Sequence, residues 1–406
     1  MPAAQTMAKP VPRHILPVIV VAQLAGASLW FAGNAVMPDL QRRSGLAVEA
    51  LSDMTIAVQL GFITGTLVFS FFALVDRFSP RAIFLASALL GAACNALTYF
   101  MGAHLAPLLL LRFATGFFLA GIYPVGMKIA SGWFDRDLGQ ALGFLIGALV
   151  LGTATPHLIG HNLPWEGVML SVSAIAALGG LVMYSLVPDG PYLRAGAGFD
   201  PTAFAAIFRS PDFRASSFGY FGHMWELYAF WAFVPVYLAA QAGSGSEAAA
   251  SRISLWSFLI IGAGAVGSVA GGLLQRRFGS ARIAFFQLAA SGLCCLLSPL
   301  AYLLPQPAMM GFLLFWGIVV VGDSPQFSAL NARYAPPHLI GSALTIVNCI
   351  GFAITIPSIQ LLASALPVVG AQHLFVLLFP GPLLGLLALL RLVRGRGSRT
   401  AQCEAR

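Results

Sequence analysis

The sequence predicts an all-α membrane protein with twelve transmembrane helices in two six-helix halves related by pseudo-symmetry. Three observations predict this fold class: the composition, the lengths of the apolar runs and an internal repeat. Of the 406 residues, 58% are hydrophobic and only 9% are charged, whereas a soluble domain carries about 25% charged residues. A chain this poor in charge cannot cover itself with a water-facing surface, so we expect lipid to be its solvent.

The apolar runs are long enough to cross a bilayer. A spanning helix needs about 20 apolar residues, and short polar stretches divide this chain into runs of that length. The twelve expected spans are residues 14–37, 54–75, 82–102, 106–129, 139–160, 165–187, 215–240, 253–274, 282–304, 308–332, 340–364 and 372–393.

An internal repeat divides these spans into two sets of six. "LVDRFSPRAIFL" at 74–85 matches "LQRRFGSARIAFF" at 274–286, and "GIYP" at 121–124 matches "GDSP" at 322–325. Two halves of like orientation are one known architecture of secondary transporters. We expect an N-terminal half at 1–187, a cytoplasmic connecting loop at 188–214, and a C-terminal half with a short cytoplasmic tail at 215–406.

The basic residues predict the orientation. With the N-terminus inside, 18 of the 22 Lys and Arg residues fall in inner segments; the others are Arg42, Arg43, Arg252 and, inside a span, Arg112. The positive-inside rule therefore predicts a multi-pass protein of the cell membrane, taken as a bacterial inner membrane, with both termini cytoplasmic. The net charge of +8 then marks topology, and no nucleic-acid partner is expected.

The motifs resemble those of the major facilitator superfamily over essentially the whole chain. The inner loop "DRFSPR" at 76–81 is similar to that family's loop signature, although Phe72 and Ser79 replace its glycines. Span 4 is similar in its Arg112, Gly116 and Ala120 spacing. The resemblance implies a transporter that works by alternating access, with spans 1, 4, 7 and 10 lining a central cavity. It also implies a conformational role for the inner loops, whose candidate residues are Asp76, Arg77, Arg81, Arg276 and Arg277.

Away from the ends of the spans, three charged side chains fall inside them, and all three lie on spans 1, 4, 7 or 10: Arg112, Glu226 and Asp323. Intramembrane charges normally face a protein interior or a cavity. A carboxylate whose access alternates between two sides can take up a proton on one side and release it on the other. We expect Glu226 first and Asp323 second as proton-coupling groups. His223 shares a helical face with Glu226 and is the third candidate.

Polar and aromatic residues on the same spans are candidates for the substrate pocket. Arg112 is expected either to anchor substrate or to tie helices together through backbone carbonyls. The candidate substrate-binding residues are Arg112, Gln23, Trp30, Asn34, Tyr123, Tyr220, Trp225, Tyr228 and Gln326, with Gln59, Ser324 and Asn348 ranked lower. Tryptophan and tyrosine are also routine at helix contacts, so packing is the competing interpretation for each.

The expected function is therefore transport of a small solute, driven by protons. Two carboxylates and only one arginine lie deep inside the spans, and this excess of negative groups favours an organic cation or an amphipathic solute. A small-anion carrier of the nitrate or nitrite type, a metal-ion carrier, and a membrane receptor or assembly factor without flux are the alternatives. The sequence shows no phosphate-binding loop and no nucleophile–base motif, so we expect no enzyme activity, no cofactor and no bound metal. The expected partners are the solute, protons and the bilayer, and the expected state is a monomer.

Overall fold

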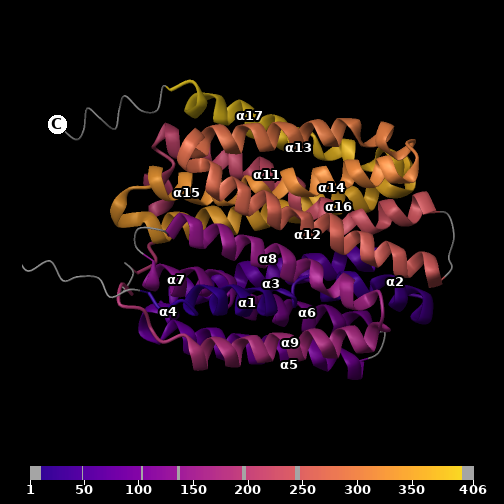
Figure 1. Cartoon of the computed structure of the whole chain (residues 1–406), viewed down its shortest axis with the longest axis horizontal. Helices are drawn as coiled ribbons and strands as arrows, with labels where there is room; N and C mark the ends of the chain where they lie inside the picture. The colour runs from indigo at the N-terminus through magenta and orange to yellow at the C-terminus, as the bar shows by residue number, and fades with distance from the viewer. Residues whose placement is uncertain are drawn as a thin grey trace, which may run out of the picture.

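The computed structural model describes residues 11–47, 49–101, 104–134, 138–193, 198–242 and 247–395. Within these ranges the regular structure is helical. Figure 1 shows long helices running side by side, with the N-terminal helices in one half of the bundle and the C-terminal helices in the other. This confirms the predicted all-α fold class.

The N-terminal half contains nine helices in the described residues. They are α1 (Ile15–Ala27), α2 (Ala32–Ser44), α3 (Ala50–Phe71), α4 (Leu74–Arg77), α5 (Pro80–Met101), α6 (Leu105–Leu119), α7 (Tyr123–Trp133), α8 (Leu138–Gly160) and α9 (Trp165–Leu186). The short α4 lies in the loop that carries the "DRFSPR" motif.

The connecting segment holds the short helix α10 (Ala203–Ile207), and the C-terminal half follows it. Its elements are α11 (Pro211–Ala242), α12 (Glu247–Phe278), α13 (Ser280–Tyr302), α14 (Gln306–Gly322), α15 (Ser324–Tyr334), the 3-10 turn η1 (Pro337–Leu339), α16 (Ile340–Leu374), the 3-10 turn η2 (Phe375–Leu378) and α17 (Pro380–Val393).

The helices agree with the predicted spans. Ten stretches of the described chain are long and apolar enough to cross a membrane. The last of them, Pro337–Val393, has 57 residues and is interrupted at Gly370, whose φ of 73° is left-handed, so it is long enough for two crossings. Helix α11 is not among the ten, although its 32 residues are sufficient to cross. Together these elements are consistent with twelve crossings.

Three of the spans are broken near their middle. Span 1 is broken between α1 and α2 at residues 28–31, span 4 between α6 and α7 at residues 120–122, and span 10 between α14 and α15 at Asp323. Pro124 and Pro325 occupy the first turns of α7 and α15, where a proline's missing N–H costs no helical hydrogen bond. Broken helices at mid-membrane are tolerated where protein or a cavity surrounds them.

Each half is held together by a close helix pair at an equivalent position. A Cβ on Gly116 of α6 would collide with the Val58 carbonyl oxygen of α3, and one on Gly317 of α14 would collide with the Ile260 carbonyl oxygen of α12. Small residues allow this approach of backbones in a membrane. Between the halves, α8 packs along α12 and α3 packs along α16.

Candidate functional site

A cavity of about 810 Å³ lies between the two halves. Its lining comes from α3, α7 and α8 on one side and from α11, α15 and α16 on the other. The cavity reaches the end of the bundle that carries α4 and the connecting segment, because Asp76, Lys128 and Phe199 are among its lining residues. We call this end the connector end. Among the sequence candidates, Tyr123, Tyr220, Tyr228, Asp76, Ser324 and Asn348 line the cavity.

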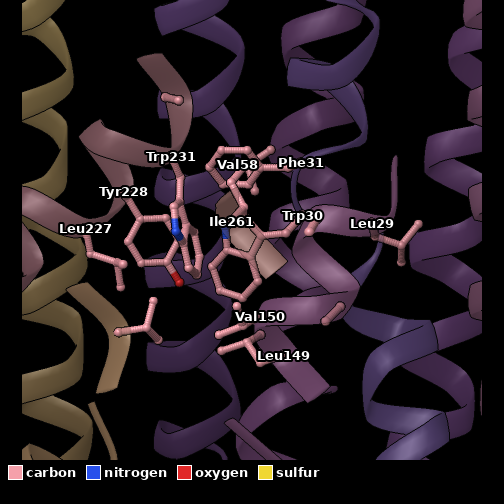
Figure 2. Packing of buried hydrophobic residues seen from close by; sticks show 14 of the residues in the cluster. Leu29, Trp30, Phe31, Val58, Leu149, Val150, Leu227, Tyr228, Trp231 and Ile261 are labelled. Carbon is pink, nitrogen blue, oxygen red and sulfur yellow. The ribbon is translucent and has the colours of Figure 1, made fainter. Parts of the chain in front are cut away.

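Aromatic side chains from both halves pack together at the far end of the cavity. The Trp30 ring stacks on Phe352, with centroids 5.4 Å apart, and lies 5.7 Å from the Tyr228 ring. The Phe31 ring meets Trp231 edge-on at 6.0 Å. Trp30 and Phe31 are N-terminal, and their partners are C-terminal, so these contacts join the two halves (Figure 2). We call this set, with Phe62, the aromatic closure.

The mouth at the connector end holds a charged pair. Lys128 of α7 forms an ion pair with Asp76 of α4 and also donates to the Val75 carbonyl oxygen at 3.2 Å. This pair links the predicted loop residue Asp76 to the second part of span 4. The lining residues in the described chain include no charged side chains other than these two.

The other loop candidates bind elsewhere or lie apart. Arg81 donates to the Tyr184 carbonyl oxygen at 3.2 Å, and its guanidinium lies 5.0 Å from the centre of the Tyr184 ring. Arg77 is exposed at the end of α4. Arg277 lies over the ring of its neighbour Phe278. The side chain of Arg276 lies outside the described residues.

His223 connects the cavity to Asp323. Its Nε2 lies 2.8 Å from Oγ of Ser324, a lining residue, and its Nδ1 lies 2.9 Å from Oδ1 of Asp323. His223 and Asp323 are each almost fully buried. In the described chain, Oδ2 of Asp323 has no hydrogen-bond partner. The break between α14 and α15 places Asp323 and Ser324 here, so three neighbouring groups reach from the cavity wall into the C-terminal half.

Glu226 lies one turn further along α11 and is buried away from the cavity. Its carboxylate accepts from Oγ of Ser291 at 2.7 Å, from Nε1 of Trp316 at 2.8 Å and from Sγ of Cys295 at 3.4 Å. These donors lie on α13 and α14. Glu226 therefore faces the interior of its own half and not the lipid.

Arg112 is the buried charge of span 4 in the N-terminal half. Its Nη2 donates to the carbonyl oxygens of Leu29 and Trp30, at 2.9 and 2.7 Å, and its Nη1 donates to Oδ1 of Asn95 at 2.9 Å. The two carbonyls belong to the break between α1 and α2, so Arg112 holds this break in place. Arg112 is fully buried and does not line the cavity. These contacts match the helix-tying interpretation of Arg112.

Four further candidates lie outside the cavity lining. Asn34 donates to Oγ1 of Thr55 at 2.7 Å. Gln23 is buried against Gly126 and Gln326 is buried against Gly271, and their amide groups have no hydrogen-bond partner within the described residues. Trp225 packs beside Gly381.

The sequence interpretation missed Trp231, Met224 and Lys128 as lining residues. Tyr220, Met224, Tyr228 and Trp231 follow one another on α11 at steps of four, four and three. This is the spacing of one helical face, so the periodicity contained the signal. Lys128 is one of the 18 basic residues that the positive-inside rule uses, and the sequence gives no further sign that it lines a cavity.

Comparison with known proteins identifies the family. The family model described as Major Facilitator Superfamily matches residues 19–359. The chain belongs to the Major Facilitator Superfamily. The structure is similar to the crystal structure of the human organic anion transporter MFSD10 (TETRAN), with a TM-score of 0.72 and 17% sequence identity, covering 94% of this chain and 100% of that one. A search of curated proteins gives no match.

Membership of this superfamily makes the chain a multi-pass membrane transporter with a small-molecule substrate. This confirms the family and the fold that the sequence motifs predicted. At 17% identity, the structural likeness is evidence for the fold and not for the substrate.

Proposed function

We propose that this transporter moves an amphipathic organic solute by alternating access and couples the movement to protons. The observation that carries the proposal is the contact of the His223–Asp323 pair with Ser324 in the wall of the cavity. Solute and proton would then be bound at adjoining places between the same two halves.

The cavity lining supports the solute class. A volume of about 810 Å³ falls within the range of pockets that bind organic molecules. The lining is mainly aromatic and aliphatic, with hydroxyl and amide side chains among it, and in the described chain its charged groups, Asp76 and Lys128, are paired with each other at the mouth. A small-anion carrier needs cationic groups within the cavity, and a permanently charged cation needs an unpaired carboxylate there. An amphipathic solute needs neither.

The His223–Asp323 pair supports proton coupling. A carboxylate removed from water is costly unless it is paired or protonated. One oxygen of Asp323 faces His223, and the ring's other nitrogen faces the cavity residue Ser324. A proton that enters the cavity therefore has a short hydrogen-bonded route through Ser324 and His223 to Asp323.

Glu226 is the second proton-binding group in this proposal. Sequence reasoning ranks it first, but its three donors already satisfy the carboxylate and it does not line the cavity. We therefore rank Asp323 first. A proton would reach Glu226, which lies one turn from His223 on α11, only through the interior of the C-terminal half.

The shape of the cavity supports alternating access. The cavity extends to the connector end, and the aromatic closure joins the halves at its far end. If the halves rock about the α8–α12 and α3–α16 contacts, the closure separates as the connector end closes.

The test is transport by the purified protein in liposomes that enclose a pH-sensitive dye. A panel of amphipathic amines, amides and ketones is added outside, with and without an imposed pH gradient. We expect at least one solute to move protons with the wild type and not with Asp323→Asn or His223→Gln. Glu226→Gln should reduce the rate less. Solute flux that is unaffected by Asp323→Asn would refute coupling at Asp323. A complete lack of flux with every solute would favour a receptor without transport.

A further inference from the structure

Two indole N–H groups that have no hydrogen-bond partner among the described residues lie at or beside the closed end of the cavity. Trp231 lines the cavity, and Trp30 packs on the lining residues Tyr228 and Phe352. Both tryptophans have about 1% of their surface exposed. Within the described chain, neither Nε1 atom has a hydrogen-bond partner. Figure 2 shows both indoles beside the Tyr228 ring, whose hydroxyl points toward the lower part of the closure.

An indole nitrogen is a donor and never an acceptor. Leaving a buried donor unpaired costs about 1–3 kcal/mol, so the closed end is set up for a group that accepts hydrogen bonds. The tyrosine hydroxyl of Tyr228 can donate as well. A solute oxygen is such an acceptor, whereas an ammonium group is not, because it only donates.

The charge of the acceptor follows from what surrounds it. No cationic side chain is described in the lining near these indoles, since Lys128 lies at the mouth and is paired with Asp76. Arg112 contacts the break that holds Trp30, but its guanidinium donates to the backbone carbonyls of that break and to Asn95. A carboxylate or sulfonate at this end would be buried without a counter-charge, which is costly. A carbonyl or amide oxygen carries no such cost.

We propose that Trp30, Trp231 and Tyr228 form a donor subsite that selects solutes with an uncharged acceptor oxygen on an apolar, ring-sized body. This inference rests on the proposed function, because it assigns a substrate class to the same cavity. The oxygen lies at the closed end. The apolar body lies along aliphatic lining residues such as Leu149, Val150 and Leu227, which flank the indoles in Figure 2.

The experiment compares three ligands that share a naphthalene ring: 2-acetylnaphthalene, 2-ethylnaphthalene and 2-naphthoate. Binding to wild-type protein in lipid nanodiscs is measured by equilibrium dialysis, with empty nanodiscs to correct for partitioning. One to two added hydrogen bonds predict that the ketone binds about tenfold more tightly than the hydrocarbon. The carboxylate should bind more weakly than the ketone. Equal binding of ketone and hydrocarbon, tighter binding of the carboxylate, or no binding of any of the three would overturn the proposal.

Three tryptophan variants locate the effect. Trp231→Phe and Trp30→Phe keep an aromatic ring and remove the donor, so each should reduce the ketone preference several-fold. Trp225→Phe is the matched control, because Trp225 lies on the same helix as Trp231, its Nε1 is also unpaired among the described residues, and it does not line the cavity. A preference that survives in both Trp231→Phe and Trp30→Phe would contradict the subsite. If one variant fails to fold, the order in which the wild-type protein binds the three ligands still tests the proposal.

The two proposals fail separately. Asp323→Asn should abolish proton movement but leave the ketone preference unchanged, because Asp323 lies behind Ser324 and does not contact the indoles. Loss of coupling with an intact preference would count against the proton route alone. An absent preference with intact coupling would count against the donor subsite alone.

Discussion

At the scale of single residues, Arg112 shows how a buried charge in a membrane helix can stabilise a break in a neighbouring helix. The two carbonyls that it binds, those of Leu29 and Trp30, lie where span 1 loses its helical hydrogen bonds. A guanidinium supplies several donors in a fixed planar geometry. It therefore satisfies backbone groups that no water reaches, and it fixes Trp30, one member of the aromatic closure.

Arg112→Lys should destabilise the protein more than it weakens solute binding, because Arg112 reaches the solute site only through the backbone of Trp30. Lysine keeps the charge but has a single ammonium group, so it cannot bind both carbonyls and Asn95 in the same geometry. Each lost hydrogen bond of a charged group costs about 1.5–3 kcal/mol. Thermal unfolding in detergent and dialysis with the tightest ligand test this together. A large loss of affinity with an unchanged melting temperature would instead make Arg112 a substrate ligand.

Glu226 makes a second prediction at this scale. In Glu226→Gln, one acceptor oxygen becomes an NH₂ group with two donors. The Ser291 hydroxyl can accept from one of them, whereas the indole of Trp316 cannot accept at all. At least one buried donor is left unpaired, and we expect a loss of about 1–3 kcal/mol. Ser291→Ala is the comparison, because it removes one donor and leaves the carboxylate bonded to Trp316 and Cys295. Glu226→Gln should have the lower melting temperature of the two, and the reverse order would show that the carboxylate is not held as described.

At the scale of the elements, the close pairs α3–α6 and α12–α14 depend on glycine. Gly317→Ala should therefore destabilise the C-terminal half. Its new methyl group meets the backbone oxygen of Ile260, which cannot move without shifting α12. Overpacking of this kind costs about 1–3 kcal/mol.

Gly311 is the control on the same helix. A methyl group at Gly311 meets no atom within 4 Å, and alanine favours a helix over glycine. Gly311→Ala should leave the melting temperature unchanged or raise it by the equivalent of about 0.4–1 kcal/mol. If both variants were equally harmless, the α12–α14 contact would be looser than the structure shows.

The elements were predictable from the sequence, and most side-chain contacts were not. The matched "GIYP" and "GDSP" segments lie at the breaks of spans 4 and 10, because glycine and proline act on the backbone locally. The partners of Glu226 come from residues 291, 295 and 316, on helices that only the packed fold brings next to α11. The break of span 1 has no proline nearby and depends on Arg112, which is remote in sequence.

At the scale of the whole molecule, two sets of contacts join the halves at the end opposite the cavity mouth. Besides the aromatic closure, His161 after α8 meets Ser251 of α12. Nδ1 of His161 lies 2.8 Å from the Ser251 carbonyl oxygen and 2.6 Å from its Oγ, and this Oγ donates to the His161 carbonyl oxygen at 3.1 Å. Separation of the halves at this end would break these bonds, so in the proposed alternating-access cycle they stabilise the present state relative to the alternative one.

Removing the bonds between His161 and Ser251, which we call the latch, should shift the populations of the two states. His161→Ala loses the bonds made by the ring, each worth about 0.5–1.5 kcal/mol. Since 1.4 kcal/mol is a factor of ten in an equilibrium constant, the state that is open at the connector end should fall several-fold to about tenfold relative to its alternative. The readout is the rate at which a water-soluble maleimide labels Ser342→Cys, a cavity-lining position at the mouth, in a background without the native cysteines.

We expect slower labelling of this cysteine with His161→Ala than without it. Ser364→Ala is the control, because among the described residues the Ser364 hydroxyl bonds to Leu361 alone, within α16, and it should leave the rate unchanged. The direction of the change in labelling rate is the decisive result, because a bond that joins the halves at one end favours opening at the other. Faster labelling with His161→Ala would mean that the latch opposes the open mouth, and the rocking of two rigid halves about α8 and α12 would then be the wrong description of this transporter.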